Sequence, residues 1–190
     1  MKRDIKQNSD IRGLEFLNSA AIDFKFNAKQ LDHLENISVS KYKINTHALK
    51  LFKEEYTKKD ALPIEISPQE FNYLKNIPEN EYFSYLLYRY EFKIFPKRKI
   101  NSKFPCYVLI EPVSSCNLKC GMCFQSDQSF INKDFMGKMN YELFKKVVDE
   151  CQAEGTKAIT FGSRGEPTIH QQFVDFISYV ENKFMDVKII

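Results

Sequence analysis

The stretch "CYVLIEPVSSCNLKCGMCF", residues 106–124, joins a short apolar run to a loop that holds three closely spaced cysteines. Its first part, residues 106–112, predicts a short buried strand. Behind this strand, Cys116, Cys120 and Cys123 are separated by three residues and then by two. Because the 190 residues contain only five cysteines, this clustering indicates a dedicated site.

Strand and helix patterns alternate on the C-terminal side of this stretch. Residues 140–155 predict an amphipathic helix, capped by asparagine at its start and stopped by glycine at its end. Residues 157–161 and 186–190 predict two further strands, and a capping box at Thr168 predicts a helix between them. Alternation of this kind predicts an α/β fold with a parallel sheet and right-handed crossovers.

Two loops follow the first two predicted strands. The cysteine segment follows the first strand, and "GSRGEPT", residues 162–168, follows the second. In parallel α/β folds, ligands bind beyond the carboxyl ends of the strands. We therefore expect both loops to lie at the same end of the sheet.

Thiolates are soft ligands that suit iron–sulfur clusters and zinc. A cubane cluster normally takes four cysteines, so three would leave one iron open to another ligand. A zinc site completed by Cys151 or His170 is the alternative, although no second paired ligand set is present. Without such a role, Cys151 and Cys106 are interpreted as core residues and His170 as a surface histidine.

The spacing C-x3-C-x2-C, with the flanking "CNLKCGMC", resembles the radical S-adenosylmethionine superfamily. It is especially similar to the SPASM-containing maturases and tailoring enzymes. Gly165, Glu166 and Pro167 resemble the G-G-E-P site of that family. The resemblance covers residues 104–190, and it implies the first part of a radical S-adenosylmethionine partial (βα)6 barrel, truncated after the third strand.

The resemblance also implies ligands for each part of the site. Cys116, Cys120 and Cys123 would bind a 4Fe–4S cluster, and the amino and carboxylate groups of S-adenosylmethionine would bind its open iron. The segment 165–167 would meet the amino group of S-adenosylmethionine.

Two further positions depart from the family pattern. Met122 stands where the family usually has an aromatic residue near the adenine, and an adaptable methionine can preserve that packing. Arg164 interrupts the glycine-rich run. It is interpreted either as a contact to a carboxylate of S-adenosylmethionine or substrate, or as a surface arginine.

The implied reaction is reductive cleavage of S-adenosylmethionine to a 5′-deoxyadenosyl radical that abstracts hydrogen from substrate. A flavodoxin- or ferredoxin-like donor would supply the electron, and no catalytic residue is assigned beyond the cluster ligands. A peptide or metabolite substrate is favoured over RNA, and the substrate itself is unknown. The alternative is a non-catalytic iron–sulfur or zinc-binding module.

Residues 1–103 predict a mainly helical N-terminal region that ends in a basic linker, residues 95–105. A helix is predicted at 46–56, and Ser67 opens a further helix with a capping box. Residues 88–94 alternate like a strand but also continue a helical stripe of apolar residues, and a helix is favoured there. The radical S-adenosylmethionine core would occupy 104–190.

The amino-acid composition limits the classes of function that the protein can have. Hydrophobic residues make up 43% and charged residues 28%, which is typical of a globular chain. The net charge of +3 argues weakly against nucleic-acid binding. No secretory signal and no run of ~18–20 apolar residues is found, so we expect a cytoplasmic protein without membrane contact.

Overall fold

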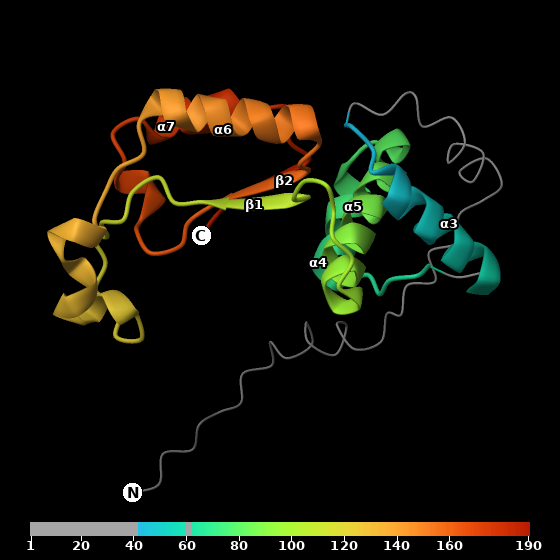
Figure 1. The fold of residues 1–190 in the computed structure, drawn as a ribbon, viewed down its shortest axis with the longest axis horizontal. Helices are drawn as coiled ribbons and strands as arrows, with labels where there is room; N and C mark the ends of the chain where they lie inside the picture. The colour runs from blue at the N-terminus through green and yellow to red at the C-terminus, as the bar shows by residue number, and fades with distance from the viewer. Residues whose placement is uncertain (1–41, 60–61) are drawn as a thin grey trace, which may run out of the picture. The chain divides into compact units, whose positions relative to one another are not determined.

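Figure 1 shows the computed structural model, which describes residues 42–59 and 62–190. The chain divides into two compact units. Among the described residues, the first unit holds 46–90, and the second holds 42–45 together with 91–190. The part of the predicted helical region that precedes residue 42 lies outside the described residues.

The first unit is helical. It contains α3 (Thr46–Lys59), α4 (Pro68–Asn76) and the first part of α5 (Glu79–Arg98). The capping box that opens α4 is confirmed, since the Ser67 hydroxyl accepts from the Glu70 N–H and the Glu70 carboxylate accepts from the Ser67 N–H. The helices predicted at both sides of this cap are confirmed as well.

Aromatic rings form the interior of this unit. Phe52 of α3 is fully buried, and the rings of Phe83 and Tyr90 stand edge-on to it at 5.5 and 5.4 Å. Such edge-to-face pairs stabilise a core beyond the burial of their area. Glu70 and Arg89 are largely buried and form an ion pair, so α4 is tied to α5 by charge as well as by packing.

The predicted linker begins as helix, which corrects its boundary. Helix α5 continues through Arg98 because Phe95, near its end, is buried. The helix stops at Lys99, whose φ is +56°, and there the Ile100 N–H donates to the Phe95 carbonyl at 2.9 Å. None of the helices that the structure describes, α5 included, has the length and apolarity needed to cross a bilayer.

The second unit is built on a parallel sheet. Its strands are β1 (Tyr107–Ile110), β2 (Ala158–Phe161) and β3 (Asp186–Ile189), in the order β1-β2-β3. Ile110 pairs with Phe161, which pairs with Ile189. All three predicted strands are confirmed.

Two helices cover one face of this sheet (Figure 1): α6 (Tyr141–Glu154) and α7 (Phe173–Val180). The Asn140 side chain accepts from the Leu143 N–H at 2.7 Å and caps α6. Gly155 ends α6 with φ +96°, a conformation that favours glycine. Both ends of the predicted helix are thereby confirmed.

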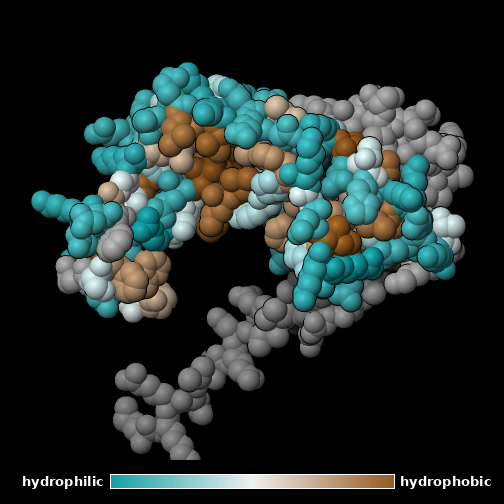
Figure 2. Space-filling model, in the orientation of Figure 1, coloured by the Kyte–Doolittle hydropathy of each residue, from teal (hydrophilic) through white to brown (hydrophobic). Residues whose placement is uncertain are grey.

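The core of the second unit lies between these helices and the sheet. Phe144 and Phe176 are fully buried and stack at 4.1 Å, with Ile159 and Phe161 of β2 in the same cluster. In Figure 2, hydrophobic residues gather below α6 and α7 in the region of the sheet, while polar residues cover the outer side of the helices. The face of the sheet that packs on the helices therefore supplies the apolar core.

The predicted start of a (βα)6 barrel is wrong. The described residues form an open sheet of three strands, in which β1 and β3 each pair only with β2. A barrel requires a sheet closed on itself with a fixed stagger, and three strands of four residues do not supply it. The alternation of strand and helix patterns predicted each element, but it did not determine whether the sheet closes into a barrel.

The helix predicted to open at Thr168 begins five residues later, at Phe173. The Glu166 carboxylate accepts from the Thr168 N–H at 3.0 Å, and this bond closes a short 3-10 turn, η6 (Pro167–Ile169), instead. Behind the turn, the Gln172 N–H donates to His170 Nδ1 at 3.1 Å. Side-chain hydrogen bonds to the backbone thus replace the expected first turn of α7.

A short N-terminal strap, residues 42–45, belongs to the second unit. The buried ammonium of Lys157 donates to the Lys43 carbonyl and, at 2.7 Å, to the Gly155 carbonyl. Burial lowers the pKa of Lys157 to about 8. Asn45 is held as well, since its amide donates to the Glu91 carboxylate at 2.8 Å.

We expect Phe144→Ala to lower the free energy of unfolding by about 3–5 kcal/mol, because it leaves a cavity beside Phe176 that the surrounding structure only partly fills. Urea unfolding followed by circular dichroism measures the change. Leu143→Ala, next in the chain but 47% exposed, is the control and should change stability by less than about 0.5 kcal/mol. Equal losses in both variants would contradict the placement of the core.

Candidate functional site

Two loops emerge from the carboxyl ends of β1 and β2, as the sequence predicts. We call residues 114–137 the cysteine loop and residues 162–167 the glycine loop. The ends of the cysteine loop are joined by an antiparallel bridge between Val113 and Lys138 and by a bond from the Ser114 N–H to the Gly137 carbonyl at 3.0 Å. The three cysteines therefore lie on a loop that is closed at its base.

Three 3-10 turns fill the second half of the cysteine loop: η3 (Phe124–Ser126), η4 (Gln128–Ile131) and η5 (Lys133–Phe135). Asp127 and Asn132 cap the second and third turns through their side chains. Asx side chains favour such turns because they bond the backbone two residues ahead. The loop thus has its own local hydrogen bonds.

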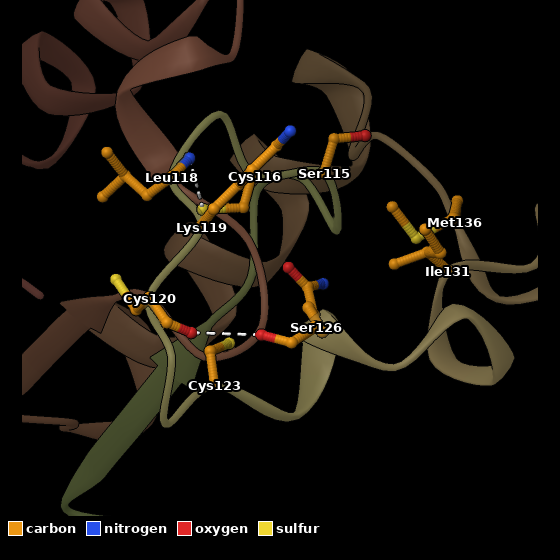
Figure 3. Close-up of a pocket in the computed structure, with 10 residues that line it drawn as sticks. Ser115, Cys116, Leu118, Lys119, Cys120, Cys123, Ser126, Ile131 and Met136 are labelled. Atoms are coloured by element: carbon orange, nitrogen blue, oxygen red, sulfur yellow. Dashed lines mark hydrogen bonds between the residues drawn. The ribbon is translucent and has the colours of Figure 1, made fainter.

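A cavity of about 550 Å³ lies inside the cysteine loop (Figure 3). All three cysteines line it, and Leu118, Ile131 and Met136 contribute apolar side chains. In the close-up, Ile131 and Met136 lie across the cavity from the cysteines. The cavity therefore combines sulfur donors with an apolar wall.

The three thiols differ in their surroundings. Cys116 and Cys123 are half-buried and Cys120 is exposed, and none forms a disulfide. The Leu118 N–H donates to Cys116 Sγ at 3.4 Å, and the Cys120 carbonyl accepts from the Cys123 N–H at 3.0 Å and from the Ser126 hydroxyl at 3.1 Å. Backbone bonds therefore fix the turn from which Cys120 and Cys123 project.

This donor set fits an iron–sulfur cluster by its chemistry, because three sulfur donors from one loop line one cavity. Within the described ranges 42–59 and 62–190, no group of three His, Cys, Asp or Glu side chains is arranged so that it could hold a metal ion. The thiols line the cavity without converging on one point. Binding would then draw them together, as in metal sites whose formation is coupled to metal binding.

The glycine loop packs directly against the start of the cysteine loop. A Cβ atom on Gly165 would lie 1.8 Å from the Val113 carbonyl oxygen and 2.7 Å from that of Ser115. The Glu166 N–H donates to the Ser115 carbonyl at 3.0 Å. Only glycine permits this approach at position 165. The segment around Gly165 is therefore held against Ser115, the residue that precedes Cys116 in the chain.

Glu166 turns its carboxylate toward its own loop. It accepts from the Thr168 N–H at 3.0 Å and from the Thr168 hydroxyl at 2.6 Å, and these bonds lower the pKa of Glu166. Pro167 is buried beside it. The side chain of Glu166 thus shapes the loop, while the backbone of the segment faces the cysteine loop.

Arg164 contacts a carboxylate of its own chain, that of Glu111 at the end of β1. Arg164 Nη2 lies 2.7 Å from Glu111 Oε1, and Arg164 Nε lies 3.0 Å from Oε2. Burial raises the pKa of Glu111, but hydrogen bonds from Arg164 and Ser114 outweigh it and lower that pKa to about 2. The pair therefore stays ionised at neutral pH.

The other predicted positions vary in their surroundings. Met122 is 91% exposed on the cysteine loop. Cys151 is buried in the core, as predicted, and burial raises the pKa of its thiol. The prediction of a surface histidine at 170 is wrong, since His170 is buried and its Nε2 lies 3.0 Å from the Met139 carbonyl oxygen. His170 lies against the core ring of Phe176, with ring centroids 4.7 Å apart, and is not among the residues that line the cavity.

The sequence reading missed Glu111, Ser114 and Gln125. Glu111 lies at the carboxyl end of β1, opposite Arg164 after β2, and this place in the sequence is a signal that points to the site. Gln125 donates to the Ser114 carbonyl at 2.7 Å and so holds the cysteine turn to the base of its loop. No local pattern marks that contact.

Part of the chain is similar to a protein of Pyrococcus furiosus, the tungsten-containing aldehyde ferredoxin oxidoreductase cofactor-modifying protein. The two are 38% identical over 78 residues, which cover 40% of this chain and 21% of the relative. The chain thus spans well under two thirds of the length of that relative. No protein-family model matches the sequence, and no solved structure matches it.

We expect Gly165→Ala to destabilise the fold by at least about 1–3 kcal/mol, because the added methyl group overlaps the Val113 carbonyl. Urea unfolding measures the loss. Gly121→Ala is the matched control, since a Cβ there meets nothing within 4 Å. A neutral Gly165→Ala would show that the two loops do not approach as described.

The stability of the protein should fall as the pH drops from about 4.5 toward 2, partly because Glu111 is protonated there. Its folded pKa of about 2 lies below its ordinary value of 4.5, so its contribution is complete above 4.5 and disappears as the pH approaches 2. Urea unfolding of wild type and Glu111→Gln at several pH values measures this, and the difference between them should shrink across that window. Glu142→Gln, which removes an exposed carboxylate on α6, is the control and should show no comparable change.

Proposed function

We propose that this chain carries the cluster-binding part of a radical S-adenosylmethionine enzyme of the SPASM-like maturase group, and that the enzyme modifies a protein cofactor. The observation that supports this most is the cavity of about 550 Å³ that all three cysteines line, on the loop that leaves β1. The name of the Pyrococcus furiosus relative, a cofactor-modifying protein, agrees with a role in maturation.

In this proposal, Cys116, Cys120 and Cys123 hold a 4Fe–4S cluster as thiolates. When bound and reduced, such a cluster supplies the electron that breaks a carbon–sulfur bond of S-adenosylmethionine, and the 5′-deoxyadenosyl radical so released abstracts hydrogen from substrate. Three protein thiolates would leave one iron of such a cluster open to the amino and carboxylate groups of S-adenosylmethionine. The chain itself would bind the cluster, orient S-adenosylmethionine and shield the site from water.

The residues around the cavity would perform these tasks. The backbone of the segment 165–167 lies beside Ser115, and in this proposal it would meet the amino group of S-adenosylmethionine. Leu118, Ile131 and Met136 form the apolar wall that keeps water from a reactive centre. Met122 is exposed and can fold over the adenine because its side chain is adaptable.

The proposal also includes a reductant of the flavodoxin or ferredoxin class. Cys120 is exposed, so an edge of the bound cluster would stay accessible to a small electron-transfer protein. The substrate would be a peptide or a metabolite, and the cofactor-modifying relative favours a precursor of a metal-containing cofactor.

Anaerobic reconstitution with iron and sulfide tests this function. We expect about four irons and four sulfides per chain, with a brown colour, and release of 5′-deoxyadenosine when S-adenosylmethionine and dithionite are added. Cys120→Ala should lose most of the iron, whereas Cys106→Ala, outside the loop, should retain it. A colourless protein that binds one zinc, or iron uptake that is equal in both variants, would overturn the proposal.

A further inference from the structure

We propose that Arg164 is a positioning residue of this site: through Glu111, it fixes the spacing between the glycine loop and the cysteine loop. The inference rests on the proposed function for its meaning in catalysis, but the contacts that carry it belong to the chain alone. It assigns Arg164 a partner within the protein in place of a ligand carboxylate.

Arg164 donates several hydrogen bonds to a single carboxylate, that of Glu111. Glu111 Oε2 accepts from the backbone N–H of Arg164 at 3.1 Å and from its Nε at 3.0 Å, while Oε1 accepts from Nη2 at 2.7 Å. A planar guanidinium matches a carboxylate in this two-pronged way and fixes its direction as well as its distance. Both the side chain and the backbone of Arg164 are therefore held to the end of β1.

Ser114 extends this contact into the cysteine loop. Its hydroxyl donates to Glu111 Oε1 at 2.8 Å and accepts from Arg164 Nη2 at 3.2 Å. Its backbone is held too, since its carbonyl accepts from Gln125 and its N–H donates to Gly137. Ser114 is buried, and it joins the ion pair to the middle and to the end of the cysteine loop.

The residues that make these contacts are close in the chain to the proposed ligand-binding residues. Arg164 precedes Gly165, and Ser114 lies two residues before Cys116. Between them, the Glu166 N–H donates to the Ser115 carbonyl. A shift of Arg164 would therefore move the segment proposed to bind S-adenosylmethionine relative to the first cluster ligand.

The ion pair is partly withdrawn from water, with 20% of the Glu111 side chain and 38% of the Arg164 side chain exposed. Partial burial reduces screening by salt, so the pair keeps its geometry better than an exposed surface pair would. Lys188 and Asp186 form an ion pair elsewhere on the sheet, with 56% of the Lys188 side chain and 14% of the Asp186 side chain exposed, and Lys188 provides the comparison.

The test distinguishes two roles of Arg164, contact with Glu111 and direct contact with a ligand carboxylate. It does so by removing the carboxylate of Glu111. Wild type, Glu111→Gln, Arg164→Gln and the double variant are reconstituted with iron and sulfide, and the dissociation constant of S-adenosylmethionine is measured by equilibrium dialysis. All four keep the three cysteines, so their iron content should be equal. The electron paramagnetic resonance spectrum of the reduced cluster, with and without S-adenosylmethionine, reports whether the ligand reaches the iron.

If Arg164 acts through Glu111, each single variant should weaken binding by about tenfold and the double variant by no more, because both remove the same interaction. The spectral change on addition of S-adenosylmethionine should weaken in parallel, and Lys188→Gln should behave as wild type. If Arg164→Gln alone weakens binding, Arg164 binds the ligand carboxylate directly and the inference is overturned. Additive losses, or no loss in either single variant, overturn it as well.

Hydrogen–deuterium exchange on the metal-free protein keeps this test independent of the proposed function. We expect faster exchange in the segment 113–116 and in the glycine loop for Glu111→Gln and Arg164→Gln, and no change for Lys188→Gln. If wild type takes up no iron, the proposed function fails, yet this exchange result still supports or overturns the link between the loops. Unchanged exchange in both variants would overturn it.

Discussion

The parallel pairing of β1 with β2 is the constraint on which the site depends. Because the crossover runs through α6, both strands point the same way and their carboxyl ends lie side by side. Stacking of Phe144 on Phe176 holds the helices against the sheet and so preserves that pairing. The cysteine loop and the glycine loop, whose nearest ends are 25 positions apart in the chain, meet only because of it. A fold with antiparallel strands would send the two loops to opposite ends.

Local signals predicted the elements of this unit well. The period of apolar residues identified α6 and all three strands, and the cap at Asn140 and the stop at Gly155 set the ends of the helix because each satisfies backbone groups that the helix leaves open. The same signals failed at Thr168, where the carboxylate of Glu166 competes for the backbone. They also failed for the closure of the sheet, since closure depends on pairings between strands and not on the pattern within any one of them.

The sequence indicates candidate ligands for the site, but it does not indicate the residues that support them. Three thiols at this spacing indicate metal chemistry by themselves, because few other arrangements of that residue type bring soft donors so close together. Glu111 has no such pattern around it, and its role depends on a partner 53 residues away. His170 shows the same limit, since a histidine in a polar stretch reads as a surface residue until Met139 and Gln172 are placed against it. Supports that act across the sheet become visible only in the folded structure.

The turn that carries Arg164 explains why such a support is needed. Ser163 has φ +102°, a conformation that side chains other than glycine adopt at a cost of about 1–3 kcal/mol. Strain of this kind persists only where the surroundings leave the chain no alternative, and here the Arg164 N–H bonds to Glu111 while Gly165 closes on the Val113 carbonyl. Both contacts come from the segment that follows β1, so the strained turn is stable only after β1 and β2 have paired. The glycine loop therefore takes its shape from the assembled sheet, which couples the geometry of the site to correct folding.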